Sequence, residues 1–366
     1  MQSVENKVTQ TGKRVVVGLS GGVDSAVAAL LLKRQGYDVV GLFMRNWHEE
    51  DECGRCTADD DFFDVRRVAD KLGIDYYTKD LSEKYLDRVF AHFLEEYKKG
   101  RTPNPDVLCN REIKFDAFTS FAETIGADYV ATGHYADVSH AERHLLLRSA
   151  DENKDQTYFL NQVTESQLSR ALFPLGSLRK TEVRRIAEEA GLPVWEKKDS
   201  TGICFIGERN FRKFLSEYIP MKKGEIVTTD GTVVGEHDGV FYYTKGQRKG
   251  LGVGGGGNGQ PYFVVDKDVA TNRLIVTQGE TELLYSSALT VDSFHFISER
   301  LPEGESEVLA RVRHRQPLQK AVAITEGDRV RVVFKEKQRA VQEGQYAVLY
   351  QGRVCLGGGV IESSER

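Results

Sequence analysis

The sequence predicts an α/β protein with an N-terminal doubly wound domain on a parallel sheet, a small β-rich central domain and a C-terminal antiparallel β-barrel. In the first part of the chain, apolar runs of strand length alternate with segments of helical periodicity, which is typical of a parallel sheet covered by helices on both faces. Beyond residue 210 the strands become short and turn pairs such as Asp230-Gly231 recur. We therefore expect domains at residues 1–210, 211–275 and 276–366.

Composition places the chain among ordinary globular proteins. Its 366 residues are 40% hydrophobic and 29% charged, which allows two or three cores. No apolar stretch approaches the ~20 residues of a membrane helix, and the N-terminus lacks a secretory or an arginine-rich targeting pattern, so a cytoplasmic protein without a membrane partner is expected. Five cysteines form no dense disulfide framework, and a net charge of -5 excludes a general nucleic-acid coat but not local basic surfaces.

The first predicted element is a strand that ends in a loop, VVVGLSGGVDS at residues 15–25. Gly21 and Gly22 let the backbone approach a ligand, Ser20 and Ser25 offer hydroxyls, and the helix that follows points unpaired N–H groups at an anion. A Walker A loop would contain a lysine, and this loop has none. The loop therefore suits a pyrophosphate group held by backbone and hydroxyl groups.

The following elements continue the alternation. We predict helices over Ala26–Gln35, Asp59–Leu72, Tyr85–Tyr97 and Ile113–Ile125, and strands over Tyr37–Met44, Ile74–Tyr77 and Asp128–Thr132. In such a sheet the ligand lies beyond the C-terminal ends of the strands. The loop, Met44 and Gly133 all fall at such ends.

The C-terminal part carries strand patterns suited to a small barrel. They lie at Val308–Val312, Ala321–Ile324, Arg329–Phe334 and Tyr346–Tyr350. The glycine-rich run at residues 252–259 predicts a flexible connection and not a second nucleotide loop, because no helix follows it. Cys355 falls in a terminal strand pattern, where we expect it to pack in the core.

Two lone cysteines lie in irregular polar stretches. Cys109 belongs to RTPNPDVLCNREIKF, a proline-broken loop expected to lead into a helix that begins near Arg111. A thiol at a helix N-terminus beside Arg111 and Lys114 should have a lowered pKa. Most lone cysteines are small buried hydrophobes, but the flanking prolines and polar residues weaken that interpretation here. Cys204, in KKDSTGICFIG, is a weaker candidate by itself.

The stretch WHEEDECGRC invites a zinc or redox interpretation through Cys53, Cys56 and His48. Only three plausible ligands are close together, and no second CxxC completes a tetrahedral site. We therefore expect a solvent-exposed, mobile acidic loop and no tightly bound metal. The pattern leaves the role of the two cysteines open.

Two regions are locally basic. Residues 209–251 hold eight Lys or Arg against five Asp or Glu, and residues 311–320 hold four basic residues and no acid. Both could follow the phosphates of a nucleic acid. A run of charges is, however, more often a solvated face.

Several motifs give the sequence a family resemblance. SGGVDS resembles the signature of the PP-loop ATP pyrophosphatases, which adenylate an oxygen of a substrate. In chain order the motifs are SGGVDS, TPNPDVLCNREIKF, GHYA, KDQTYFL, DSTGICFIG and KGQRKGLG. Together, along nearly the whole chain, they resemble the tRNA-specific 2-thiouridylases. The resemblance implies a PP-loop domain, a small central domain and a C-terminal β-barrel. The implied sulfurtransferase replaces the 2-position oxygen of the wobble uridine by sulfur and releases AMP and pyrophosphate.

The resemblance also implies binding residues. It assigns ATP to Gly18, Leu19, Ser20, Gly21, Gly22, Val23, Asp24, Ser25, Met44 and Gly133, with Mg²⁺ bound alongside the nucleotide. It assigns the tRNA to Asn104, Pro105, Asp106, His134, Lys154, Asp155, Gln156, His314, Arg315 and Gln345. Of these, Asn104, Pro105 and Asp106 would receive the flipped target base.

The implied chemistry needs two thiols. Cys204 would carry a persulfide, and Cys109 would attack it, either to free the terminal sulfur or to leave a Cys109–Cys204 disulfide. Asp106 would act as general acid or base. An adenylated oxygen is a good leaving group, so a sulfur nucleophile can displace AMP. The implied partners are wobble-uridine tRNAs, those for Lys, Glu and Gln, and a persulfide-donating sulfur-carrier protein or cysteine desulfurase.

Two other functions stay open. An ATP pyrophosphatase that transfers nitrogen would leave Cys109 and Cys204 unexplained, and the chain has no glutaminase segment. A non-catalytic tRNA-binding protein would use ATP only as a conformational ligand. Formation of AMP and of thiolated uridine distinguishes the three functions.

Overall fold

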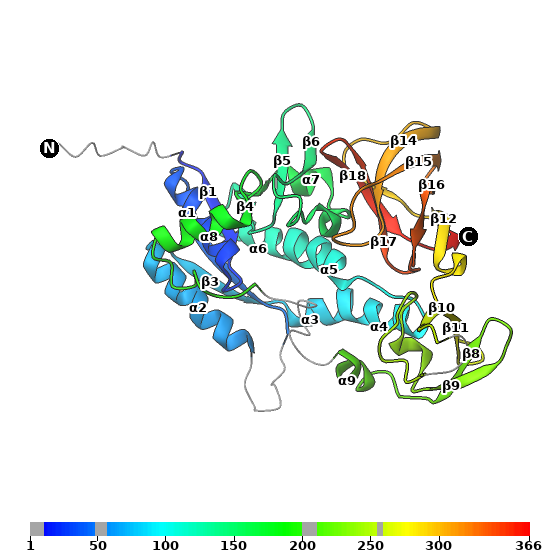
Figure 1. The fold of residues 1–366 in the computed structure, drawn as a ribbon. Helices are drawn as coiled ribbons and strands as arrows, with labels where there is room; N and C mark the ends of the chain where they lie inside the picture. Colours follow the sequence, from blue (N-terminus) through cyan, green and yellow to red (C-terminus); the bar gives the residue numbers. More distant parts are fainter. Residues whose placement is uncertain (1–10, 48–56, 200–210, 255–258) are drawn as a thin grey trace. The chain divides into compact units, whose positions relative to one another are not determined.

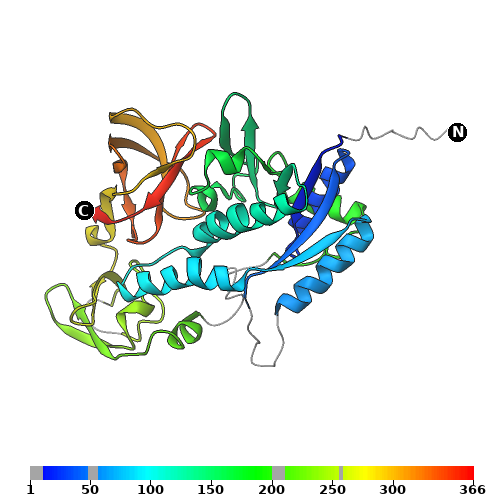
Figure 2. The ribbon, with the colours of Figure 1, turned by 180° about the vertical axis from the view of Figure 1, so that it is seen from behind.

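The computed structural model describes residues 11–47, 57–199, 211–254 and 259–366. The chain divides into two compact units (Figures 1 and 2). The first comprises the described parts of Met1–Val89 and Asp106–Phe205 together with Arg353–Cys355. The second comprises Phe90–Pro105, the described parts of Ile206–Gly352, and Leu356–Arg366.

A parallel sheet forms the centre of the first unit, as the sequence predicts. Its strands are β1 (Arg14–Gly18), β2 (Asp38–Arg45), β3 (Tyr76–Asp80), β4 (Tyr129–Ala131) and β7 (Ala171–Leu172). They lie in the order β3-β2-β1-β4-β7, and each neighbouring pair is parallel. β1 is therefore the central strand, with β2 on one side and β4 on the other.

Helices pack on both faces of this sheet (Figure 1). Val15 and Val17 point into a core formed with α1 (Val23–Arg34), α2 (Thr57–Leu72) and α8 (Lys180–Glu189). Val16 points to the opposite face, where it meets Phe118 and Ala122 of α6 (Phe118–Thr124). This alternation follows from the two-residue period of a strand. It confirms the doubly wound arrangement.

Several boundaries differ from the predicted ones. α1 begins at Val23 and not at Ala26, and β3 occupies Tyr76–Asp80 and not Ile74–Tyr77. The predicted Tyr85–Tyr97 helix is divided into α3 (Ser82–Tyr85), the π-helical η1 (Leu86–Phe90) and α4 (Ala91–Lys98).

The predicted helix start near Arg111 is wrong. The chain is already helical in α5 (Pro105–Leu108), and it continues through the π-helical η2 (Cys109–Ala117) into α6. Proline is compatible with the first turn of a helix, because the N–H that it lacks has no intrahelical partner there. Pro105 therefore starts the helix, whereas the sequence interpretation took it to break the chain into a loop.

The first unit also contains elements outside the predicted alternation. β5 (Ala136–His140) and β6 (His144–Arg148) form an antiparallel hairpin, and β6 pairs with Val354 at Leu147. The short helices η3 (Thr157–Leu160) and α7 (Glu165–Leu168) follow.

The second unit begins its β-rich part with a small sheet of order β10-β11-β8-β9. Its strands are β8 (Gly224–Thr228), β9 (Val233–His237), β10 (Tyr262–Asp268) and β11 (Arg273–Gln278), and the short helix η4 (Val240–Tyr242) lies between β9 and β10. Ile226, Tyr243, Val264, Leu274 and Val276 fill its core. Part of the predicted glycine-rich connection, residues 255–258, lies outside the described residues.

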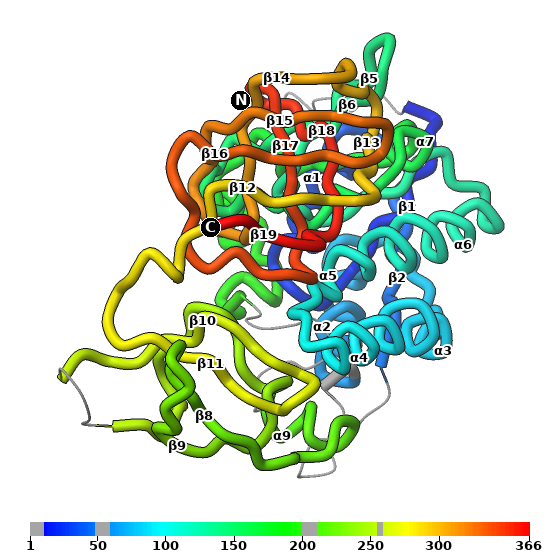
Figure 3. The backbone as a smooth tube through the Cα atoms, turned by 90° about the vertical axis from the view of Figure 1, so that its right-hand side faces the viewer, coloured from blue at the N-terminus to red at the C-terminus, as the bar shows by residue number. Residues whose placement is uncertain are grey.

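An antiparallel sheet forms the C-terminal part of this unit (Figure 3). After η5 (Glu282–Leu284) its strands are β12 (Tyr285–Val291), β13 (His295–Phe296), β14 (Gly304–Arg311), β15 (Gln319–Glu326), β16 (Arg329–Arg339), β17 (Tyr346–Gln351), β18 (Val354–Val360) and β19 (Ser363–Glu365). All four predicted strand segments fall within these strands or extend one residue past their ends. Cys355 is buried in β18, which confirms its predicted packing role.

Aromatic side chains join α4 to α9 (Phe211–Ser216) in the second unit. The ring of Phe90 lies 5.9 Å from that of Phe214, and the ring of Tyr97 lies 5.8 Å from that of Phe211. Phe93 has no exposed surface and contacts both Phe90 and Tyr97. This cluster anchors the chain directly after residues 200–210.

We expect Phe93→Ala to lower the free energy of unfolding by about 3–5 kcal/mol, because the truncation leaves a cavity among rings that have little room to collapse. Denaturant unfolding followed by fluorescence measures the change. Phe63→Ala, which removes a ring that is 60% exposed on α2, is the control and should change stability by less than about 0.5 kcal/mol. Equal effects of the two variants would contradict the packing role of the cluster.

Candidate functional site

The loop Ser20–Ser25 follows β1 at the C-terminal end of the sheet and is held by its own serines. The Ser20 N–H donates to Ser25 Oγ at 3.2 Å, and Ser25 Oγ donates to the Gly22 carbonyl at 3.1 Å. Ser20 Oγ lies 3.3 Å from Ser25 Oγ. The hydroxyls thus fix the shape of the loop before any ligand arrives.

Glycines allow two close backbone approaches at this loop. Gly21 has a φ of +73°, and a Cβ there would lie 2.6 Å from the Asp61 carbonyl oxygen. At the end of β4, a Cβ on Gly133 would lie 2.6 Å from the Ser25 nitrogen. Gly22 differs, since an added Cβ would meet only Ser20 Oγ, at 3.4 Å. Gly21 and Gly133 are therefore needed for packing, whereas the space beside Gly22 is open to a ligand.

The first turn of α1 presents backbone N–H groups that lie outside the intrahelical hydrogen bonds. Gly22 caps this helix without a side-chain hydrogen bond. The Ala26 N–H donates to the Gly22 carbonyl at 3.3 Å, so the N–H groups of residues 23–25 precede the first intrahelical bond. Such N–H groups and the helix dipole favour a bound phosphate.

Met44, which the resemblance assigns to the adenine side of a nucleotide together with Gly133, lies next to Gly18. A Cβ on Gly18 would be 3.4 Å from the Met44 Cε and 3.5 Å from the ring of Phe118. Gly18 therefore leaves room for the Met44 side chain at the ends of β1 and β2.

A lysine that the sequence analysis missed lies beside the loop. Lys180, the first residue of α8, donates to both carboxylate oxygens of Asp24 at 2.8 Å. The Tyr135 hydroxyl donates to the same carboxylate at 2.9 Å, and burial followed by the nearby Asp24 charge raises the pKa of Tyr135. The loop has no lysine of its own, but the fold supplies one from a helix far along the chain.

Lys180 also belongs to a second cluster, centred on Asp199. Asp199 accepts from Lys180 at 2.7 Å, from Lys154 at 2.7 Å and from Arg184 at 2.8 Å. Burial alone would raise the pKa of Asp199, but the hydrogen bonds from Lys154 and Lys180 lower it to about 2. Lys154, which the resemblance assigns to tRNA, is thus ion-paired with Asp199, and Asp199 directly precedes residues 200–210, which include Cys204. Cys204 itself lies outside the described residues.

Cys109 is buried at the start of η2, with 1% of its surface exposed. The helix that contains it begins at Pro105, so Cys109 lies beyond the first helical turn. The influence of a helix dipole falls off within that turn. Cys109 therefore does not lie at a helix N-terminus, contrary to the prediction from the sequence. Asp106, in the first turn of α5, is half-buried.

Two residues assigned to tRNA from distant motifs meet in the second unit. The Asn104 side-chain amide donates to Gln345 Oε1 at 3.4 Å. Gln345 Nε2 in turn donates to the carbonyls of Thr102 at 2.8 Å and Pro103 at 3.3 Å. Gln345 thus supports the backbone directly before Asn104 and Pro105.

His134 lies in the core of the first unit. Its Nδ1 is 2.7 Å from Thr132 Oγ1, and its ring packs between Phe115 and Phe173. Burial, and then the charge of Lys114, hold the pKa of His134 well below its usual value. The imidazole is therefore neutral at neutral pH.

The KDQ stretch at residues 154–156 is only partly open to solvent. Asp155 is 1% exposed and accepts from the Thr157 hydroxyl at 3.0 Å. Gln156 accepts from the Tyr135 N–H at 2.9 Å. Asp155 is therefore hydrogen-bonded inside the unit, whereas the amine of Lys154 is partly exposed.

The basic run at residues 311–320 is divided between core and surface. Arg311 is buried, with its guanidinium 5.8 Å from the Tyr350 ring centre. Arg313 and Arg315 are exposed after β14, and Arg315 has a φ of +65°. His314 is half-buried between them. The surface charge of the run is thus smaller than its composition predicts.

The described residues contain no group of three or more His, Cys, Asp or Glu side chains suited to a metal ion. His48, Cys53 and Cys56 lie outside those residues. In the same described ranges, no helix is long and apolar enough to span a bilayer.

Comparison with known families defines the class of protein. Residues 13–208 match a family model described as the tRNA methyl transferase HUP domain. Residues 212–278 match a tRNA methyl transferase PRC-barrel domain, and residues 286–361 match an aminomethyltransferase beta-barrel domain. The chain is thus a protein with an N-terminal HUP domain and two following β-rich domains.

Curated relatives identify the family within this class. The chain is 57% identical to a tRNA-specific 2-thiouridylase MnmA from Alkaliphilus oremlandii, over 95% of this chain and 97% of the relative. It is 56% identical to the protein of the same name from Streptococcus thermophilus, over 96% of this chain and 95% of that one. The chain belongs to the tRNA-specific 2-thiouridylase family.

Solved structures give a more distant likeness. The U34-tRNA thiolase NcsA from Methanococcus maripaludis matches with a TM-score of 0.35 and 18% identity, over 58% of this chain and 66% of that one. A 4-thiouridine synthetase–RNA complex with bound ATP matches with a TM-score of 0.33 and 18% identity, over 57% of this chain and 51% of that one.

The burial of His134 predicts a pH dependence of stability. The unfolded chain binds a proton at this histidine near pH 6.5, whereas the folded protein resists it, so a fall in pH below 6.5 favours unfolding. His134→Asn keeps a hydrogen-bonding group near Thr132 without titrating. We expect the variant to lose up to about 2 kcal/mol less stability than the parent between pH 7 and pH 5. Urea unfolding at both pH values measures this, and parallel losses in the two proteins would contradict it.

Proposed function

We propose that this chain catalyses the ATP-dependent 2-thiolation of the wobble uridine in tRNA. The observation that carries the proposal is the loop Ser20–Ser25, whose shape is fixed by its serines and closed by Gly133, in a chain 57% identical to a 2-thiouridylase. A phosphate-binding loop beside an ordered helix N-terminus suits cleavage of ATP between the α and β phosphates. A cytoplasmic location and domains at 1–210, 211–275 and 276–366 belong to the same proposal.

The first step activates the oxygen. ATP binds to residues Gly18–Ser25 with Met44 and Gly133, and the uridine 2-oxygen attacks the α-phosphorus. The bond from that phosphorus to the bridging oxygen breaks, pyrophosphate leaves, and the uridine is adenylated. The carboxylate of Asp24 is engaged by Lys180 and Tyr135, so Mg²⁺ that neutralises pyrophosphate charge would enter with the nucleotide.

The target base is received by Asn104, Pro105 and Asp106. The hydrogen bonds from Gln345 to the Thr102 and Pro103 carbonyls support this assignment, because they order the backbone that leads into it. Asp106 acts as the general acid or base for the uridine. Since proton transfer needs hydrogen-bond reach, its carboxylate must approach the base in the complex.

The second step transfers sulfur. Cys204 carries a persulfide, Cys109 attacks the Cys204 sulfur, and hydrosulfide leaves as a Cys109–Cys204 disulfide forms. The hydrosulfide attacks C2 of the uridine and displaces AMP. Two external thiol groups then reduce the disulfide and are themselves joined as a disulfide, which returns both cysteines to the thiol state.

The remaining contacts and partners follow from the family. The exposed Arg315 and the partly exposed Lys154 contact tRNA phosphates. His314 and Gln345 contact the tRNA as well. His134, Asp155 and Gln156, which are hydrogen-bonded inside the first unit, support the segment that carries Lys154. The substrates are the wobble-uridine tRNAs for Lys, Glu and Gln, and the sulfur donor is a persulfide carrier or cysteine desulfurase.

We expect Cys204→Ser and Cys109→Ser each to lower 2-thiouridine formation by at least about 10³-fold, since each removes a thiol needed for sulfur release. Both variants should still release pyrophosphate when given ATP, Mg²⁺ and unmodified tRNA. Mass spectrometry of digested tRNA measures the thiolated base. Cys355→Ala, which removes a buried thiol in β18, is the matched control and should retain parental thiolation.

Other outcomes of this assay would contradict the proposal. Pyrophosphate release without thiolated uridine from the parent protein, with a persulfide donor present, would indicate a different acceptor such as ammonia. Binding of tRNA and ATP without AMP formation would indicate a non-catalytic binding protein. Thiolation by Cys204→Ser at the parental rate would remove that residue from the mechanism.

The position of Lys180 predicts a role in nucleotide affinity. Lys180→Met removes the cation beside the loop and leaves the Asp24 charge uncompensated, so we expect ATP affinity to fall about ten-fold or more. Isothermal titration calorimetry without tRNA measures it. Arg185→Met, on the exposed face of the same helix, is the control and should bind ATP normally.

A further inference from the structure

One turn of the C-terminal domain contacts two segments that carry tRNA-binding motifs. We call residues Gln342–Gln345 the linking turn. The first contacted segment is Thr102–Asn104, directly before Pro105. The second is the basic loop Lys245–Lys249 of the KGQRKGLG motif. All three lie in the second unit.

Gln342 holds the backbone of Lys245 from both sides. Its Oε1 accepts from the Lys245 N–H at 3.3 Å, and its Nε2 donates to the Lys245 carbonyl at 2.7 Å. The amine of Lys245 lies 2.8 Å from Glu343 and 3.3 Å from Asp266. Gln342 is buried, with 8% of its surface exposed. Hydrogen bonds and ion pairs therefore fix the start of the basic loop to the linking turn.

The other end of the turn holds the segment before the proposed base site. The Thr102 N–H donates to the Glu343 carbonyl at 2.9 Å. Gln345 Nε2 donates to the Thr102 carbonyl, and Gln345 Oε1 accepts from Asn104. A single turn thus contacts both the basic loop and Thr102–Asn104, the segment that leads into the proposed base site.

Two glycines allow these close approaches. Gly246 has a φ of +78°, and a Cβ there would lie 2.6 Å from the Ala340 Cβ. Gly344 has a φ of +91°, and a Cβ there would lie 3.0 Å from the Thr102 nitrogen. A larger residue at position 246 would push the basic loop away from Ala340, and one at position 344 would push Thr102 away from the turn.

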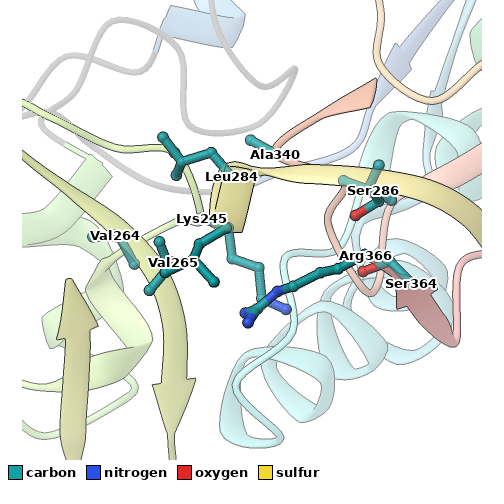
Figure 4. Close-up of a pocket in the computed structure, with 11 residues that line it drawn as sticks. Lys245, Val264, Val265, Leu284, Ser286, Ala340, Ser364 and Arg366 are labelled. Carbon is teal, nitrogen blue, oxygen red and sulfur yellow. The ribbon is translucent and has the colours of Figure 1, made fainter. Parts of the chain in front are cut away.

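The pocket beside Lys245 shows the same junction (Figure 4). Lys245 lines it together with Val264 and Val265 of β10. Ala340 and Ser364, from the C-terminal sheet, line it as well. Lys245 thus lies where the small central sheet and the C-terminal sheet meet.

The turn is itself held by the last strands of the chain. The Gly344 N–H donates to the Ile361 carbonyl at 3.0 Å, and the Ile361 N–H donates to the Gln345 carbonyl at 2.8 Å. Ser364 Oγ donates to Glu343 at 3.3 Å. The linking turn is therefore a braced element and not a free loop.

The far end of the basic loop is available to a ligand. Arg248 and Lys249 are exposed, and neither makes an ion pair with a residue in the described parts of the chain. Lys245 is instead committed to Glu343 and Asp266. In this motif Lys245 therefore holds the loop in place, whereas Arg248 and Lys249 are exposed cations that suit phosphate groups.

We propose that the linking turn positions Thr102–Asn104 relative to the basic loop, with Gln342 as the positioning residue that holds the basic loop to the turn. RNA held through Arg248 and Lys249 then presents its target nucleotide at a fixed spacing from Asn104. This inference rests on the proposed thiolation of tRNA. In this proposal Gln342 acts without contacting the substrate. The central and C-terminal domains together form one tRNA-binding surface.

The test uses Gln342→Met in the full-length protein, because methionine keeps the volume of the side chain but neither hydrogen bond. We expect kcat for thiolation to fall about 10–100-fold, since a small misplacement of a reacting group has effects of this size. Affinity for tRNA, measured by fluorescence anisotropy, should change less than about three-fold because the phosphate contacts persist. Hydrogen exchange of the peptide that contains Thr102 should become faster in the free protein.

Arg248→Gln with Lys249→Gln should give the opposite result. This double variant should weaken tRNA binding and reduce its salt dependence by about one phosphate contact per residue. The loss of thiolation should appear mainly as a higher KM for tRNA. Gln342→Glu, which keeps the acceptor for the Lys245 N–H but loses the donor, should lie between the parent and Gln342→Met.

Thr325→Val is the matched control, because it removes a buried hydroxyl of the same sheet outside the three segments. The inference would be overturned if Thr325→Val lost as much kcat as Gln342→Met, or if Gln342→Met kept the parental kcat. It would also be overturned if Gln342→Met lost affinity for tRNA and kcat to the same extent. Absence of thiolation by the parent protein would instead overturn the proposed function.

Discussion

The contact between the Gly133 backbone and the start of α1 is the constraint on which the loop Ser20–Ser25 depends. β1 and β4 are neighbours in the sheet, so the residues that follow them share one edge. A Cβ on Gly133 would lie 2.6 Å from the Ser25 nitrogen, and the two chains can approach only because none is present. That approach, together with the internal bonds of Ser25, leaves the first N–H groups of α1 in a fixed array. An array fixed before binding does not lose entropy when the anion arrives.

Charge around this array is arranged by tertiary contacts and not by the loop. Lys180 joins Asp24 of the loop to Asp199, and Asp199 also holds Lys154 and Arg184. The nucleotide loop and the beginning of the Cys204 segment therefore share one lysine. A change in the charge beside Asp24 must alter the partners of Asp199, because the same amine serves both carboxylates. The linking turn plays a comparable part in the second unit, where Gln342 holds the basic loop and Gln345 holds Thr102–Asn104.

The sequence predicted the parallel sheet, the position of the loop and the strands of the C-terminal domain because each rests on local periodicity and on turn residues. It failed at residues 105–117, where Pro105 begins a helix. It took the proline as a breaker, since the pattern does not show whether a proline occupies a first helical turn. The same error made Cys109 a helix N-terminal thiol, whereas it is buried within the helical segment. The hairpin β5–β6 has no strong turn signal and was not predicted.

The sequence by itself determined the chemistry that this chain holds: a loop with two glycines and two serines, lone cysteines, and motifs similar to those of the 2-thiouridylases. These are properties of residue type and spacing along the chain. The tertiary structure alone decided which charges and amides meet, because Lys180 with Asp24, Gln345 with Asn104, and Gln342 with Lys245 are separated by 97 or more residues. Such pairs leave no periodic pattern. They form only when the folded chain brings distant segments together.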